Sequence, residues 1–72
     1  MKSLDLHNYS HDEAEDMVMT FLNWTEVPCK IITGNSKKMK TIVRSVVYYY
    51  GLHCYDESAF NCGALIVVEG EW

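Results

Sequence analysis

The sequence predicts a single domain of the α/β class, in which both helices cover one face of a mixed four-stranded sheet. Short apolar segments alternate with two amphipathic segments along the 72 residues. This alternation is typical of strand–helix–strand units. A hydrophobic content of 49% with 22% charged residues is that of a folded chain rather than a disordered one.

The first strand is predicted from Ser3 to His7, where two leucines alternate with an acid and a histidine. Because successive side chains of a strand point to opposite faces, Leu4 and Leu6 should face the helices. Asp5 and His7 should then stand together on the uncovered face. A polar outer face is the ordinary interpretation of this pattern, but an acid beside an imidazole can also bind phosphate, move protons or ligate a metal.

The first helix is expected to begin after Ser10 and to end near Asn23. Ser10 and Glu13 have the spacing of a capping box, which satisfies free amides at a helix start. A buried stripe is predicted from apolar residues at helical spacing: Ala14, Met17, Val18, Phe21 and Leu22. Met19 is expected to face outward, and Trp24 is expected to cover the end of the helix.

A second strand is predicted over residues 29–33, because this β-branched segment lies between Pro28 and Gly34. After a tight loop, the second helix should begin near Ser36 or Lys37. Its predicted stripe consists of Met39, Ile42, Val43, Val46, Val47 and Tyr50. Gly51 is expected just after the helix, where a left-handed backbone favours glycine.

The last two strands are predicted over residues 52–55 and 64–69, the latter a continuous apolar run typical of an interior strand. Strand–helix–strand crossovers are right-handed and join parallel strands. Both helices therefore fall on one face if the chain crosses the sheet in one direction. The last strand can then return antiparallel between the second and third strands, which gives the order 1-2-4-3. The uncovered face should expose Ile31 or Ile32. An exposed apolar face can bind a second copy of the chain, so the sequence is compatible with a monomer or with a homodimer formed through this face.

Charge and cysteine content exclude several classes of protein. The net charge of -4 argues against a protein that coats nucleic acid non-specifically. One central segment is nevertheless basic and forms either a binding patch or a solvated helix start; its cations are Lys30, Lys37, Lys38, Lys40 and Arg44.

The three cysteines, Cys29, Cys54 and Cys62, have no CxxC spacing, so we expect packed, reduced thiols in a cytoplasmic protein. No apolar run approaches the about 20 residues of a membrane span, and no signal peptide is expected.

Ligands gather where parallel strands end, so Asp5 and His7 should lie beside the loop at residues 33–36. Loop amides at a helix N-terminus can hold an anion such as phosphate. The candidate substrate-binding residues are Thr33, Gly34, Asn35, Ser36, Lys37 and Lys38. Ordinary helix capping is the alternative explanation of this loop.

The motifs taken together resemble a known family. Leu4-Asp5-Leu6-His7 followed by Glu13-Ala14 resembles the LDxHG…EA opening of the Smr (small MutS-related) domain. Residues 31–36 look like its second motif, an apolar strand followed by [TH]GxG, and residues 63–67 are similar to its closing strand. The resemblance covers nearly the whole chain. It implies the βαβαββ fold of the C-terminal domain of bacterial translation initiation factor three, with strand order 1-2-4-3.

The resemblance also implies nucleic-acid binding and endonuclease activity, either cleavage of RNA, including messenger RNA on stalled ribosomes, or nicking of DNA. Asp5 and His7 match the residues treated as catalytic in the family, and Thr33 and Gly34 match its substrate loop. Asn8 and Ser36 stand where the family has glycine. These two departures favour binding over catalysis.

Three hypotheses follow. The first is a ribonuclease without cofactor or metal, in which His7 is the general base or acid and Asp5 orients it. The second is a non-catalytic module for RNA, DNA or a protein surface, with His53 and Tyr55 available to stack on bases. The third, a metal-dependent nuclease, ranks last because Asp5 and His7 need a further ligand such as His11.

Overall fold

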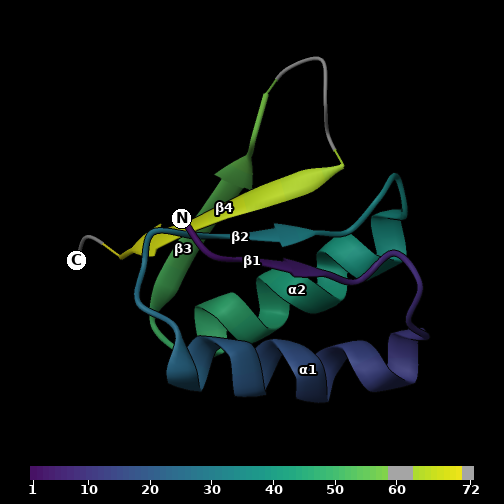
Figure 1. The fold of residues 1–72 in the computed structure, drawn as a ribbon, viewed down its shortest axis with the longest axis horizontal. Helices are drawn as coiled ribbons and strands as arrows, with labels where there is room; N and C mark the ends of the chain where they lie inside the picture. The colour runs from purple at the N-terminus through teal and green to yellow at the C-terminus, as the bar shows by residue number, and fades with distance from the viewer. Residues whose placement is uncertain (59–62, 71–72) are drawn as a thin grey trace.

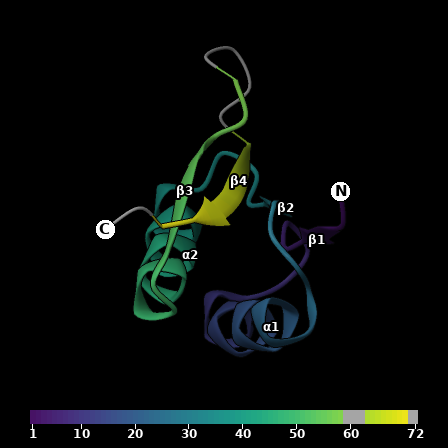
Figure 2. The same ribbon diagram turned by 90° about the vertical axis from the view of Figure 1, so that its left-hand side faces the viewer.

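In a computed structural model, which describes residues 1–58 and 63–70, the chain folds into two helices and four strands. They are β1 (Ser3–Asp5), α1 (His11–Trp24), β2 (Cys29–Ile32), α2 (Lys37–Tyr49), β3 (Leu52–Asp56) and β4 (Ala64–Glu69). β1 and β2 are parallel, and β4 lies antiparallel between β2 and β3. Both helices lie on one side of the sheet (Figures 1 and 2). The predicted class and the order β1-β2-β4-β3 are therefore confirmed.

The core lies between the sheet and the two helices, and both predicted helical stripes contribute to it. Its buried members are Leu6, Ala14, Val18, Leu22, Cys29, Ile31, Met39, Val43, Val46, Val47, Leu65 and Val67. The helix ends also form as predicted. Ser10 and Glu13 make the capping box, and Gly51 follows α2 with a φ of 74°.

Two predicted side-chain positions on α1 are wrong. Met19 is half-buried between α1 and α2, where its carbonyl oxygen accepts a hydrogen bond of 3.4 Å from the Tyr50 hydroxyl. The buried stripe is broader than predicted because α1 contacts α2 as well as the sheet. Trp24 does not cover the helix end and is 83% exposed. It follows the buried Leu22 by two residues, which turns its side chain about 200° around the helix axis.

Three predicted strand ends also shift. β1 stops at Asp5, two residues early, because the chain turns there. β2 stops at Ile32, one residue early, although its hydrogen bonding toward the β4 side continues in the bond from the Thr33 amide to the carbonyl oxygen of Gly63. β3 continues one residue further, to Asp56.

The open face of the sheet carries the side chains that alternate with the core. Ile31 is fully buried beneath the helices, so its neighbour Ile32 is the isoleucine of the open face. Tyr55 lies on this face beside Ile66, which pairs in turn with Lys30 of β2. Ile66 is only 8% exposed although no helix covers it.

The thiols that the structure describes are packed, as predicted. Cys29 is buried and Cys54 is half-buried, and burial raises the pKa of both thiols. Cys62 lies outside the described residues, as do residues 71–72. Neither helix of the described chain has the length and apolar character needed to cross a membrane.

Leu6→Ala should lower the free energy of unfolding by about 3 kcal/mol, because Leu6 is fully buried and its loss leaves a cavity. That is a large part of the ~4–11 kcal/mol expected for a domain of this length. Urea denaturation followed by far-UV circular dichroism measures it. Leu4→Ala is the matched control, since Leu4 is only half-buried in the edge strand. Equal losses for the two variants would contradict the assignment of Leu6 to the core.

Candidate functional site

The turn that follows β1 brings Asp5 and His7 together. The His7 backbone amide donates a hydrogen bond of 3.1 Å to Oδ1 of Asp5, which is an Asx-turn. The Tyr9 amide closes the turn with a bond of 3.0 Å to the Leu6 carbonyl oxygen. Oδ1 of Asp5 also lies 2.5 Å from Nδ1 of His7. One carboxylate oxygen therefore ends the strand and holds the imidazole.

The contact with His7 fixes which ring nitrogen is available for chemistry. The hydrogen bond from the His7 ring is the main cause that lowers the pKa of Asp5 below its usual 3.8, followed by the bond from the His7 amide. At neutral pH Asp5 is therefore a carboxylate, which can only accept hydrogen bonds. Nδ1 must carry the proton in this contact, and Nε2 of a neutral His7 is left with a lone pair. No side chain in the described parts of the chain bonds to Nε2.

The loop after β2 lies against His7, as the strand order predicts. Gly34 has a φ of 67°, a conformation that favours glycine. A β-carbon built on Gly34 would be 3.8 Å from Cβ of His7. The backbone of the loop therefore forms one wall beside the imidazole.

Hydrogen bonds within the protein already occupy several groups of this loop. The amides of Thr33 and Gly34 donate to the carbonyl oxygen of Gly63 at 2.8 and 3.0 Å. The Thr33 side chain is 2% exposed, and its hydroxyl donates to the Gly34 carbonyl oxygen at 2.9 Å. Ser36 caps α2 by accepting a bond of 3.1 Å from the Met39 amide. The expectation that the Gly34 amide is free to hold an anion is therefore wrong.

A pocket of about 400 Å³ opens beside the imidazole on the uncovered face. Its lining residues are His7, Lys30, Ile32, Gly34, Asn35, Glu57, Gly63 and Ala64. Of the predicted substrate residues, Gly34 and Asn35 line it directly. Lys37 and Lys38 are exposed at the start of α2 and do not line it. Neither lysine makes an ion pair within residues 1–58 and 63–70.

Two charged residues of this pocket, Lys30 and Glu57, were not among the predicted site residues, although Lys30 belongs to the basic central segment. Nζ of Lys30 lies 2.5 Å from Oε2 of Glu57. Strand alternation could have placed Lys30 on the face of Asp5, opposite Ile31. No local signal could have found Glu57, which lies in a segment predicted as a loop.

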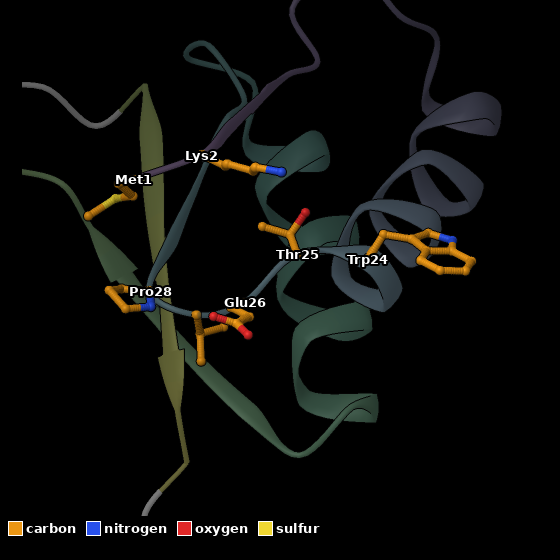
Figure 3. A pocket seen from close by; sticks show the side chains of 7 residues that line it. Met1, Lys2, Trp24, Thr25, Glu26 and Pro28 are labelled. Atoms are coloured by element: carbon orange, nitrogen blue, oxygen red, sulfur yellow. The ribbon is translucent and has the colours of Figure 1, made fainter.

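A larger hollow, of about 620 Å³, lies at the other end of β1 and β2 (Figure 3). Met1, Lys2 and residues 24–28 line it, and it includes none of the predicted site residues. The Trp24 side chain points away from the other labelled residues in Figure 3. Ligands of parallel strands gather at the carboxyl ends, which are at the opposite end from this hollow. We therefore place the candidate site in the smaller pocket beside His7.

The hypothesis of a metal-dependent nuclease required a further ligand beside Asp5 and His7. In the part of the chain that the structure describes, no group of three His, Cys, Asp or Glu residues is placed to hold a metal ion. His11 thus does not complete a ligand set with Asp5 and His7.

Comparisons of the chain with protein-family models, with curated proteins and with solved structures find no match. The function must therefore be inferred from the chemistry of the site.

Asp5 should titrate below its usual pKa of 3.8, and His7→Ala should move the midpoint upward by removing the ring hydrogen bond. Carboxyl carbon shifts followed by NMR against pH measure this. The pKa of Asp5 is lower in the folded state than in the unfolded state. The contact with His7 therefore stabilises the fold fully at pH values above the unfolded-state pKa of Asp5, and this stabilisation is lost as the pH falls through the folded-state pKa. Glu13 is the control, since its lowered pKa comes from Ser10. An Asp5 midpoint that does not respond to His7→Ala would disprove the coupling.

Proposed function

We propose that this protein is a small Smr-like endonuclease that cleaves single-stranded RNA. The observation that carries the proposal is the contact between Asp5 and His7, with Nε2 left available beside a pocket on the open face. The strand order β1-β2-β4-β3 is the one that the Smr resemblance implies. RNA is favoured over DNA because a 2′-hydroxyl supplies an internal nucleophile, so that cleavage needs no metal ion.

In the proposed reaction, Nε2 of His7 takes the proton of a 2′-hydroxyl as general base. The 2′-oxygen attacks the adjacent phosphorus, and the bond from phosphorus to the 5′-oxygen breaks. The leaving 5′-oxygen receives a proton from water, and the imidazolium returns its proton to solvent. The products are a 2′,3′-cyclic phosphate and a 5′-hydroxyl. Asp5 remains ionised, orients the imidazole and stabilises its protonated form.

The surroundings of the pair suit an extended, negatively charged strand. Asn35 lines the pocket, and the exposed Lys37 and Lys38 follow it at the start of α2. The positive end of the helix dipole adds to their attraction for phosphates. A strand lying over the pocket would reach these lysines as it leaves His7.

One observation favours a second function, that of a binding module without catalysis. Stabilising charge on the reacting phosphate requires free donors at the reaction centre. The Gly34 amide, which is nearest to His7 in the loop, is already bonded to Gly63. A domain with this loop can hold RNA beside the imidazole without cleaving it.

His7→Ala should lower the rate of RNA cleavage in EDTA by at least about 100-fold, the usual contribution of a general base. Asp5→Asn should lower it by a smaller factor. Denaturing gels of a labelled single-stranded RNA measure the rate, and the new 3′ ends should carry cyclic phosphate.

Two controls accompany this assay. His11→Ala should cleave like the wild type, because His11 lies outside the pocket. DNA of the same sequence should stay intact, because it lacks the nucleophile. Equal cleavage by wild type and His7→Ala would sink the nuclease proposal, whereas binding without cleavage by either protein would establish the binding module.

A further inference from the structure

The ion pair between Lys30 and Glu57 lies in the His7 pocket, but the proposed reaction does not use it. The two side chains come from β2 and from the segment that follows β3, so they meet across β4. They are 29% and 32% exposed, and the pair is therefore partly withdrawn from water. Ala64 and Ile66, the β4 partners of Ile32 and Lys30, are only 3% and 8% exposed on this face, although no helix covers it.

The position of Lys30 suits it for contact with a phosphate. Strand alternation directs Lys30 to the open face, because Cys29 and Ile31 on either side are fully buried. Its neighbour in β1 is Ser3, whose small side chain leaves that flank open. Among the described residues that line the pocket, Lys30 is the one lysine or arginine.

The other cations of the central segment are engaged elsewhere or lie outside the pocket. Lys40 and Arg44 each lie 3.8 Å from Asp56, in contacts between α2 and the end of β3. Lys37 and Lys38 do not line the pocket. A phosphate group that enters beside His7 therefore meets Lys30 first, and Glu57 with it.

We propose that Lys30 is the phosphate-binding cation of the His7 pocket and that Glu57 is an internal competitor, which a bound RNA phosphate displaces from Nζ. This inference rests on the proposed function for its ligand class, the phosphodiester of single-stranded RNA. An ammonium group offers three donors and no acceptor, so carboxylate and phosphate compete for the same hydrogens.

Displacement requires only a change of side-chain rotamer at Glu57. Its backbone is held by a hydrogen bond of 3.0 Å from its amide to the Ala64 carbonyl oxygen, so the strand end can stay in place. The displaced carboxylate then moves into solvent, away from the phosphate. Glu57 thus weakens binding of every anion, and a ligand must make additional contacts outside the pocket to overcome it.

A double-mutant cycle tests this competition directly. The probe is a labelled 2′-O-methyl RNA oligonucleotide, which binds as RNA but cannot undergo the proposed cleavage. Fluorescence anisotropy over a range of salt concentrations gives its Kd. Glu57→Gln should tighten binding about fivefold, the upper end for an ion pair of this exposure. Lys30→Gln should weaken binding and make the log–log salt slope shallower by about 0.7, the share of one phosphate on a single strand.

The decisive result is the dependence of one substitution on the other. In a Lys30→Gln background, Glu57→Gln should no longer tighten binding, because the ammonium group for which Glu57 and the phosphate compete is absent. If Glu57→Gln tightens binding equally in both backgrounds, Glu57 acts only by general repulsion and the inference is overturned. Lys30→Arg keeps the charge and should retain binding; its loss would equally overturn the inference.

Asp56→Asn is the matched control for charge. It removes the same single negative charge and breaks contacts with Lys40 and Arg44, which do not line the pocket. It should leave Kd unchanged, and tightening equal to that of Glu57→Gln would overturn the inference. Urea denaturation of each variant checks that it is folded.

The cycle and the cleavage assay can fail separately. Cleavage that depends on His7, together with a cycle that shows no coupling, would leave the nuclease proposal standing and remove Lys30 from the phosphate site. The opposite outcome is that the two substitutions are coupled but His7→Ala does not slow cleavage. Lys30 would then remain a phosphate ligand, and the proposal that His7 catalyses RNA cleavage would be wrong.

Discussion

The parallel pairing of β1 with β2 determines where the site forms. The pairing extends past the end of β1, because the Leu6 amide donates a hydrogen bond of 2.8 Å to the Ile32 carbonyl oxygen. That bond buries the Leu6 side chain in the core and sets the starting point of the turn. His7 can then meet Gly34, whose own position is held by the carbonyl oxygen of Gly63. The site thus depends on backbone contacts among three strand ends.

Much of the fold could be predicted from the sequence because the deciding signals are local. A capping box at Ser10, a glycine at position 51 and two apolar stripes define the helices. The handedness of the crossovers then leaves few arrangements of the strands. Alternation around Leu6 also predicted that Asp5 and His7 lie together, although the turn after Asp5, rather than strand geometry, brings them into contact.

The rest could not be predicted because it depends on contacts between segments far apart in the sequence. Thr33 matched a substrate motif, yet the carbonyl oxygen of Gly63 draws its amide and its hydroxyl into the protein. Met19 is half-buried because of where α2 lies, and no pattern within α1 contains that information. Glu57 becomes part of the site only because β4 brings the end of β3 near β2.

Oδ1 of Asp5 accepts the hydrogen bond from the His7 amide and also contacts the His7 ring. The same atom terminates a strand and orients an imidazole, so selection for the fold alone would preserve an aspartate at this position. An aspartate retained in another chain would therefore say nothing about whether that chain is an enzyme. His7 makes its structural contact through a backbone amide that any residue except proline can supply. The histidine, rather than the aspartate, is therefore the position whose retention would bear on the proposed nuclease activity.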